Sequence, residues 1–371
     1  MRITLVTAFY PGERMGGSEY QTLLIAEGLA ELGHDVVFLG TDADKEDVFD
    51  ASNLKVIEAP SWRSVGWNHH RGCITRALQW SDPDVCYVRV FEELATIVPW
   101  CGKASVPVVS VSASAKTANP FLLGYHPIET LAHLRSLQTF RHLRSFFSIR
   151  SSSVHVCNTQ ALKRQMRRWF PRKRINVIYN GSPVPPPKEV HRGSSGQVIW
   201  VNNLKRWKRP EVFVELARRL PQYDFVMIGK ISAGRRYTRQ TTAVLEDAPA
   251  NLRYLGPLPL VQVNTMISDS DLLLYTSLPV EGFGNSFLQA WLRGVPTLSL
   301  TFDLDGILQR EGVGRCAATF EQLAADVGEL MADESLRGEM GARARQYAIS
   351  HHSTHKMVTD YDTLFGELET P

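Results

Sequence analysis

The chain has 371 residues, of which 44% are hydrophobic and 21% charged, and its net charge is only +3. This composition is typical of soluble globular proteins and excludes a fibrous or largely disordered chain. The length exceeds what one hydrophobic core usually supports, so two domains are expected, and the small net charge by itself indicates no class of partner.

The five cysteines and the first residues indicate a reducing compartment. The cysteine spacing matches neither a zinc site nor a Cys-x-x-Cys pair, so free thiols are expected. The opening MRITLVTAFYPG has too short an apolar run for a signal peptide. No run reaches the roughly 18 apolar residues of a transmembrane helix. We therefore expect a cytoplasmic protein.

The first half of the chain alternates apolar strands with helices. A buried strand is predicted over 2–8, and a helix over 18–32, with Ser18 as N-cap and Gly33 as its end. Further strands are predicted over 35–40, 54–58, 85–90, 106–111 and 153–157. This alternation predicts a parallel, doubly wound sheet.

A second half repeats the pattern after a proline-rich break. The stretch 182–196, SPVPPPKEVHRGSSG, has the composition of an interdomain linker. The strands predicted beyond it are 197–202, 225–229, 253–256, 271–276 and 295–300, and the helices are 210–220 and 285–293. The expected fold class is α/β, with two Rossmann-like domains that face each other across a ligand-binding cleft.

These patterns also give domain boundaries. We expect a first domain over 1–182, a linker over 183–196 and a second domain over 197–352. The remaining residues, 353–371, are expected to form a helix that packs back on the first domain.

A glycine loop follows the first strand. Gly16 and Gly17 stand just before the predicted helix, where backbone N–H groups can approach an anion. The loop lacks the G-x-G-x-x-G spacing of dinucleotide-binding enzymes. A phosphate contact and an ordinary tight turn both fit this loop.

A basic turn follows the first strand of the second half. Lys205, Arg206, Lys208 and Arg209 lie in the segment VNNLKRWKRP, 201–210. Fixed cations at the carboxyl end of a strand suit a pyrophosphate leaving group, whose charge grows in the transition state. The alternative is a solvated basic loop.

A third motif, TSLPVEGFGNSFLQAWLRGVP, spans 276–296. Asn285 or Ser286 is expected to cap a helix whose free N–H groups suit a phosphate. Glu281 lies before the turn, and Gln289 lies one helical turn after Asn285. Such side chains suit sugar and ribose hydroxyls. The alternative is that Glu281 is a turn residue and Gln289 a surface residue.

Taken together, these motifs resemble the retaining glycosyltransferases of family 4 (glycosyl transferases group 1), which have the GT-B architecture of two Rossmann-like domains. The resemblance extends over nearly the whole chain and is most specific in EGFGNSFLQAWLRGVP. It also includes GGSEY, VIYNG at 177–181, VNNLKRWKRP, MIGK at 227–230 and YLG at 254–256.

The resemblance implies a role for individual residues. Glu281 would contact the donor sugar, Lys208 the diphosphate and Gln289 the ribose. Arg206 or Lys205 would supply a second cation. The other implied donor contacts are Gly17 near the phosphate, the backbone N–H groups of Phe283, Gly284 and Asn285, and Gly229 with the turn 256–258 near the base.

Three positions depart from the family pattern. Gln289 stands where the family has a second glutamate, and Asn203 where it often has an arginine. Ser112, Ala113 and Ser114 occupy the place of a histidine that contacts the donor sugar. An amide still bonds a ribose hydroxyl, so altered nucleotide binding is expected rather than loss of activity.

No metal site is expected. The Asp-x-Asp pattern of metal-dependent glycosyltransferases occurs at Asp303 and Asp305, beyond the donor helix, where a loop is the simpler interpretation. The resemblance implies a metal-independent reaction, with same-face attack assisted by the leaving phosphate.

A basic stretch marks the acceptor side. From Thr130 to Lys188 the chain has no Asp or Glu, and arginines and lysines interleave with leucine and aromatic residues over 130–174. Such a segment suits an anionic membrane surface or a lipid-linked acceptor. An ordinary basic helix face fits equally, and nucleic acid is not expected.

The predicted function is transfer of a sugar from a UDP- or GDP-linked donor to a glycan or lipid-linked acceptor, with retained configuration, in polysaccharide or glycoconjugate assembly. The predicted location is cytoplasmic or peripheral at the inner face of the membrane. The main alternative is a catalytically silent glycosyltransferase-like subunit that binds nucleotide or scaffolds a complex. An epimerase or phosphorylase of similar architecture is a second.

Overall fold

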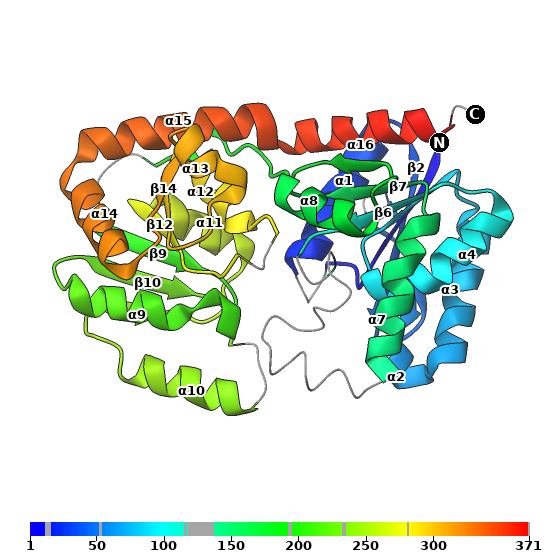
Figure 1. Ribbon diagram of the computed structural model, residues 1–371, viewed down its shortest axis with the longest axis horizontal. Helices are drawn as coiled ribbons and strands as arrows, with labels where there is room; N and C mark the ends of the chain where they lie inside the picture. The colour runs from blue at the N-terminus through cyan, green and yellow to red at the C-terminus, as the bar shows by residue number, and fades with distance from the viewer. Residues whose placement is uncertain are drawn as a thin grey trace. The chain divides into compact units, whose positions relative to one another are not determined.

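The computed structural model describes residues 1–11, 16–51, 54–114, 117, 137–191, 195–231, 235–279 and 282–369. The chain folds into two compact units, Met1–Gly181 with Thr354–Pro371, and Ser182–Ser353 (Figure 1). Each unit is α/β, which confirms the predicted fold class. Within the described residues, no helix is long and apolar enough to cross a membrane.

The N-terminal unit contains an eight-stranded sheet with the order β3-β4-β2-β1-β5-β6-β7-β8. All neighbours pair in parallel except β3, which is antiparallel to β4. The order reverses between β1 and β5, which is therefore the topological switch point. The strands are β1 (Arg2–Thr7), β2 (Asp35–Ala43), β3 (Asp47–Ala51), β4 (Leu54–Pro60), β5 (Val85–Val88), β6 (Val108–Ser112), β7 (Val154–Cys157) and β8 (Ile175–Val177).

The first and last helices of this unit pack together. Gly28 of α1 lies so close to Val358 of α16 that an added Cβ would come within 2.4 Å of its side chain. The helices are α1 (Gly17–Glu31), α2 (Trp62–Val65), α3 (Trp67–Ser81), α4 (Leu94–Ala104), α7 (Leu137–Ser148), α8 (Gln160–Trp169) and α16 (Thr354–Glu369), with short 3-10 turns η1 (Phe91–Glu93) and η2 (Ile149–Ser151).

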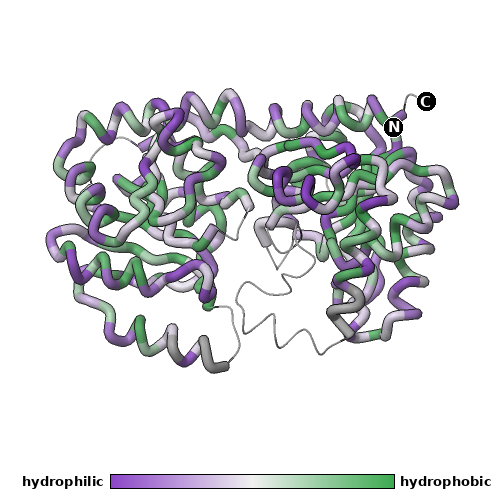
Figure 2. Tube along the Cα trace, viewed as in Figure 1, coloured by the Kyte–Doolittle hydropathy of each residue, from purple (hydrophilic) through white to green (hydrophobic). Residues whose placement is uncertain are grey.

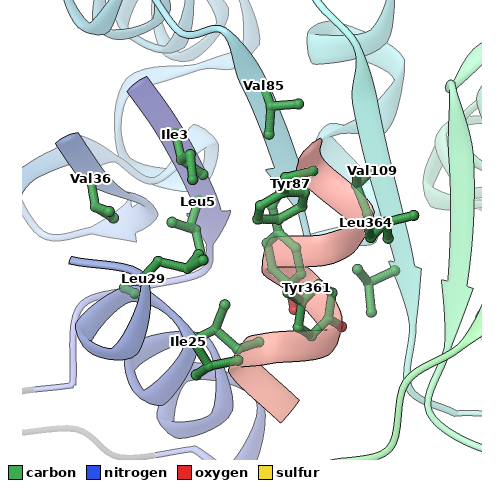
Figure 3. Close-up of a cluster of buried hydrophobic side chains, with 14 of the residues drawn as sticks. Ile3, Leu5, Ile25, Leu29, Val36, Val85, Tyr87, Val109, Tyr361 and Leu364 are labelled. Atoms are coloured by element: carbon green, nitrogen blue, oxygen red, sulfur yellow. The ribbon is translucent and has the colours of Figure 1, made fainter. Parts of the chain in front are cut away.

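One core cluster of the N-terminal unit lies between this helix pair and the sheet, as Figure 3 shows. The rings of Tyr87 and Tyr361 meet edge to face, with centroids 5.4 Å apart and planes at 79°. An aromatic pair of this geometry contributes about 0.5–1.5 kcal/mol beyond the area it buries, so the contact ties the C-terminal helix to this unit. Around it lie Ile3, Leu5, Ile25, Leu29, Val36, Val85, Val109 and Leu364.

The C-terminal unit has a six-stranded parallel sheet with the order β11-β10-β9-β12-β13-β14. Its switch point lies between β9 and β12. The strands are β9 (Gln197–Val201), β10 (Asp224–Ile228), β11 (Leu252–Tyr254), β12 (Leu272–Tyr275), β13 (Thr297–Ser299) and β14 (Gly314–Cys316).

Helices follow the strands of the C-terminal unit. They are α9 (Pro210–Arg219), α10 (Arg235–Glu246), α11 (Leu260–Ser268), α12 (Asn285–Leu292), α13 (Ile307–Arg310), α14 (Phe320–Ala332) and α15 (Glu334–His352), and α15 comes directly after α14. The 3-10 turns are η3 (Pro187–Glu189), η4 (Arg206–Lys208) and η5 (Leu304–Gly306). Trp200 is fully buried, and its indole N–H donates to Thr276 at 2.9 Å, so the large ring packs without an unsatisfied donor.

The predicted strands are confirmed to within a few residues, because each buried strand is a short apolar run. In Figure 2 the strands inside each unit are mostly green, while the helices alternate purple and green. One N-cap prediction is wrong: α1 begins at Gly17 after the cap residue Gly16, and the Ser18 carbonyl instead accepts a bond from Thr22. The predicted parallel, doubly wound sheet is confirmed, and β3, which was not predicted, adds one antiparallel strand at its edge.

The stretch predicted as a linker is bound to the C-terminal unit over its described part. His191 N–H donates to the Arg293 carbonyl at 2.8 Å, and Gly196 N–H donates to the Asp271 carboxylate at 2.7 Å. The division between the two units falls at Gly181 and Ser182, before this stretch rather than within it.

Candidate functional site

The carboxyl ends of β9 and β10 form a tight double turn around Gly229. Its φ is +149°, and an added Cβ would lie 1.7 Å from the Asn202 carbonyl oxygen, so only glycine fits. Gly229 N–H donates to the Gly256 carbonyl at 2.9 Å, and the Tyr254 hydroxyl donates to the Gly229 carbonyl at 2.8 Å. The two segments predicted near a base, Gly229 and the turn after β11, therefore lie side by side.

Lys208 ends the 3-10 turn η4 and is held at the switch point of the sheet. Its Nζ donates to Asn202 Oδ1 at 2.6 Å and lies 5.5 Å from the ring centroid of Tyr275 on β12. The Lys208 carbonyl also accepts from Thr276 Oγ1 at 2.6 Å. Contacts from both β9 and β12 thus orient the half-buried ammonium group.

Helix α12 begins beside the same tyrosine. Its N-cap is Gly284, which forms no side-chain cap hydrogen bond, so the predicted capping by Asn285 or Ser286 is wrong. A Cβ at Gly284 would lie 2.8 Å from the Tyr275 hydroxyl oxygen, so glycine permits the close approach. Tyr275 therefore contacts both the Lys208 ammonium group and the start of α12.

The residues around this helix start are only partly described. Glu281, the predicted sugar contact, lies outside the described residues. Phe283 is buried, with its ring 4.9 Å from that of His352 and 6.5 Å from that of Trp291. This packing anchors the loop that leads into α12.

Gln289 is tied to the neighbouring helix α11. Its Nε2 donates to Asn264 Oδ1 at 3.0 Å, and its carbonyl accepts from Arg293 at 3.2 Å. Asn264 has no motif around it and was not predicted as a site residue. The two side chains form a partly exposed amide pair that can both donate and accept hydrogen bonds.

Lys205 and Arg206 are the basic residues just before Lys208. Arg206 is exposed in η4, and Lys205 Nζ lies 5.1 Å from the Trp207 ring centroid. Asn203 is exposed, and its Oδ1 accepts from the Lys230 N–H at 3.4 Å. Arg206 and Lys208 thus share one turn, while Asn203 braces the turn against the end of β10.

The Asp303–Asp305 pair has a structural role. Asp303 Oδ1 accepts from the Leu308 N–H at 3.0 Å, at the start of α13. Asp305 adopts a left-handed conformation with φ of +53°. The segment forms the 3-10 turn η5, with a backbone kink at Asp305, between β13 and α13.

The N-terminal unit has a cavity of about 240 Å³ at the carboxyl ends of β1, β5 and β6. Arg89, after β5, donates to the Tyr87 hydroxyl at 3.2 Å and to Asn180 Oδ1 at 3.3 Å. Burial raises the pKa of the Glu19 carboxyl, and the Arg89 charge partly offsets this. The lining comprises Thr7, Ala8, Glu19, Arg89, Val90, Phe91, Glu92, Ser114 and Thr117.

Two predicted features adjoin this cavity. Gly17 is the exposed first residue of α1, two residues before Glu19. The Ser112–Ser114 stretch leads into the wall, where the Ser112 hydroxyl donates to the Thr117 carbonyl at 3.3 Å. Glu19 and Arg89 were not predicted as site residues. Only their positions at the ends of a strand and of a glycine loop could have identified them.

Two family models match the chain: Glycosyltransferase Family 4 over residues 15–184, and Glycosyl transferases group 1 over residues 186–347. Comparison with curated proteins gives no match. Together the two models match most of both folded units, without β1 and α16.

Solved structures share the fold at low sequence identity. A sucrose-phosphate synthase from Thermosynechococcus elongatus is 15% identical with a TM-score of 0.81, covering 99% of this chain and 98% of its own. HepE of Anabaena, in complex with UDP and glucose, is 16% identical with a TM-score of 0.75, covering 99% and 100%. WaaG, a glycosyltransferase involved in lipopolysaccharide biosynthesis, is 15% identical with a TM-score of 0.69, covering 98% and 99%.

Proposed function

Since the chain belongs to the group 1 glycosyltransferases, a GT-B family that uses nucleotide-sugar donors, we propose that it moves a sugar to a glycan or lipid-linked acceptor with retention. The reaction serves polysaccharide or glycoconjugate assembly. The proposed donor subsite is the carboxyl edge of the C-terminal sheet, and the proposed acceptor subsite is the cavity of the N-terminal unit.

The observation that carries this proposal is the fixed position of Lys208. Its ammonium group is oriented by Asn202 and Tyr275, and Tyr275 also touches Gly284 at the start of α12. A diphosphate bound here would meet the ammonium group and the N–H groups of Phe283, Gly284 and Asn285 together. Both stabilise the charge that develops on the leaving group, with Arg206 as a second cation.

The nucleoside would lie against the two glycine turns. Gly229 and Gly256 leave the backbone without side chains where a flat base can approach. The amide pair of Gln289 and Asn264 would bond the ribose hydroxyls from the adjoining helices. The UDP complex of HepE supports a uridine donor, and GDP stays the alternative.

Glu281 is proposed to contact hydroxyls of the donor sugar. In the N-terminal unit, Glu19 and Arg89 would bond acceptor hydroxyls, and Gly17 would leave room for a phosphate at the start of α1. Configuration is retained through same-face attack assisted by the leaving phosphate, with no metal in the reaction. Turnover that survives chelation by EDTA would support the last point.

The test measures nucleoside diphosphate released from UDP- and GDP-sugars by the purified chain, with and without glycan acceptors. Acceptor-dependent release that the Glu281→Ala and Lys208→Ala variants lose would support the proposal. If UDP or GDP raises the melting temperature but no nucleoside diphosphate is released from the nucleotide sugars, the chain would instead be the silent nucleotide-binding subunit. Release that depends on added phosphate would indicate a phosphorylase.

We also propose that α8 contacts an anionic membrane surface, which would make the protein peripheral at the inner face. The helix buries Leu162 and Met166 on one side. Trp169 and Phe147 are 39% and 55% exposed, so apolar side chains are available next to the charges. The basic residues on and after this helix are Lys163, Arg164, Arg167, Arg168 and Arg172.

Sedimentation with vesicles tests the membrane contact. Each basic residue near an anionic surface contributes about 1 kcal/mol, so changing Arg164, Arg167 and Arg168 to Glu should abolish binding to phosphatidylserine vesicles. Arg343→Glu, in the C-terminal unit, is the matched control. Equal binding by the triple variant and the control would contradict the proposal, and α8 would then be an ordinary basic helix face.

A further inference from the structure

Three metal-ligating side chains meet in the N-terminal unit, outside the cavity described above. Glu46 lies in the turn between β2 and β3, and His69 and Cys73 lie on α3. One carboxylate oxygen, one imidazole nitrogen and the thiol sulfur are all within 4.8 Å of one another. The cluster joins segments more than 20 residues apart, so the cysteine spacing gave no sign of it.

The arrangement on α3 is that of a helical ligand pair. His69 and Cys73 are four residues apart, so they project from the same side of the helix, one turn apart. Imidazole, thiolate and carboxylate together suit Zn²⁺, whereas Mg²⁺ and Ca²⁺ prefer oxygen ligands alone. Three protein ligands with a water as the fourth complete a tetrahedral site.

The positively charged Arg76 side chain lies next to Cys73 and Glu46. The Arg76 guanidinium Nη2 lies 3.1 Å from Cys73 Sγ and 3.3 Å and 3.4 Å from the two Glu46 oxygens. The Arg76 and Glu46 side chains are 57% and 50% exposed, and ion pairs at such exposure contribute little to stability. The arginine is long and solvated, so it can swing away at small cost and expose the sulfur.

We propose that Glu46, His69 and Cys73 bind one zinc-class divalent cation, which displaces Arg76. The metal bonds to the Cys73 sulfur as the thiol proton passes to solvent, to a neutral His69 nitrogen and to a Glu46 oxygen. The ion joins the β2–β3 turn to α3 and so fixes the start of β3, the antiparallel strand next to β4. Its proposed role is to join these two segments, and it takes no part in the proposed sugar transfer.

Burial and then the Glu46 carboxylate raise the pKa of the Cys73 thiol, while Arg76 lowers it. The metal-free thiol is therefore protonated at neutral pH, and metal binding releases a proton. Affinity for the ion should accordingly increase from pH 6 to pH 8, because the thiolate and not the thiol binds the metal.

The test uses Co²⁺ as a spectroscopic substitute for Zn²⁺ on the full chain, without a purification tag and after treatment with EDTA. A sulfur-to-cobalt charge-transfer band in the near ultraviolet is expected at one equivalent, and Zn²⁺ should remove it. Cys73→Ser should lose the band. Cys316 is partly exposed, whereas the other four cysteines are buried, so Cys316→Ser is the control and should keep the band.

Two further variants sharpen the result. His69→Ala should weaken Co²⁺ binding at least tenfold, whereas Arg76→Ala should strengthen it several-fold by removing the competing cation. Zn²⁺ should raise the melting temperature of the wild type and of Arg76→Ala but not of Cys73→Ser. No band at millimolar Co²⁺, or a band that Cys73→Ser retains, would overturn the proposal.

Discussion

The two edges of the C-terminal sheet carry charged residues that are held in different ways. At the amino edge the Asp271 carboxylate is fully buried and accepts from Gly196 N–H at 2.7 Å and Ser195 N–H at 3.0 Å. At the carboxyl edge Lys208 is half-buried, and an amide oxygen and an aromatic ring orient it. Because the Asp271 carboxylate is enclosed, it can only stabilise the fold. The partly exposed Lys208 ammonium group is accessible to a ligand.

The difference between the two edges predicts that Asp271 controls stability and Lys208 controls turnover. Asp271 lies 3.3 Å from His191 and 3.7 Å from Arg337, so its charge is neutralised within the fold. These partners come from the stretch before β9 and from α15, so the carboxylate joins three segments of the unit. Changes at the amino edge should therefore affect the free energy of unfolding, and changes at the carboxyl edge should affect turnover.

The largest expected effect is that of Asp271→Ala. Removing one member of a buried ion pair leaves its partners without compensation and costs about 3–5 kcal/mol. Urea denaturation followed by circular dichroism measures the loss. Asp269→Ala, an exposed carboxylate two residues earlier, is the control and should change stability by less than about 0.5 kcal/mol. Equal losses in the two variants would remove the distinction between the edges.

Lys208→Ala should give the next largest effect, on turnover instead of stability. Loss of one preorganised charge-stabilising group typically lowers kcat by about 10²–10³-fold. The melting temperature should stay near that of the wild type, because the side chain is not part of the core. Lys188→Ala, an exposed lysine of the same unit, should retain full activity. Turnover of Lys208→Ala within tenfold of the wild type would contradict the proposed role.

The sequence predicted much of the carboxyl edge, because its glycines and lysine occur in short local motifs. It did not predict that Tyr275 belongs to the site. In the sequence Tyr275 is one more residue of a buried strand, and only the structure shows its hydroxyl beside Gly284. The sequence also did not predict Asn264, whose pairing with Gln289 depends on how two helices pack. Contacts between segments that are distant in the sequence produce no recognisable spacing of residues. For the same reason the contacts of Asp271 with His191 and Arg337 were not predicted.

The weak strands were missed for a related reason. The β3 sequence DVFDA is mostly exposed, so it lacks the apolar run that marks the other strands. The strands β8 and β14 each have one buried residue among three, so neither has a buried apolar run of its own. Their pairing is set by neighbouring strands rather than by their own sequence.

The amide pair should give a smaller effect at the carboxyl edge. Asn264→Ala removes one hydrogen-bond partner of Gln289, worth about 0.5–1.5 kcal/mol, so UDP affinity should fall roughly 2–12-fold. Calorimetric titration measures this change. Gln289→Glu should retain affinity, because the Asn264 amide can donate to a carboxylate.

The ribose role has its own control. The wild type should bind 2′-deoxy-UDP more weakly than UDP, and Asn264→Ala should discriminate less between the two. Undiminished discrimination in this variant would show that the pair does not contact the ribose.

The smallest expected effect is a pH dependence of stability at the amino edge. Burial alone would lower the pKa of His191, but hydrogen bonds to Asp271 and to the Ser268 carbonyl outweigh it and raise the pKa above its ordinary value, with Arg337 opposing. His191 Nδ1 lies 2.9 Å from the Ser268 carbonyl oxygen and Nε2 lies 3.3 Å from Asp271, so the protonated ring donates to both.

A raised pKa in the folded state means that the His191 contribution is complete below the unfolded pKa of about 6.5 and is lost as pH rises through the folded value. The wild type should therefore exceed His191→Gln in free energy of unfolding by more at pH 5.5 than at pH 8.5. Urea denaturation at both pH values measures this difference, with the exposed Lys188→Ala variant as the control. The contribution of Asp271 itself persists throughout this window, because its pKa is lowered: although burial would raise it, the His191 hydrogen bond and the Arg337 charge outweigh burial. A pH-independent difference between wild type and His191→Gln would mean that the ring is neutral, and that Arg337 and the backbone N–H groups alone compensate the buried carboxylate.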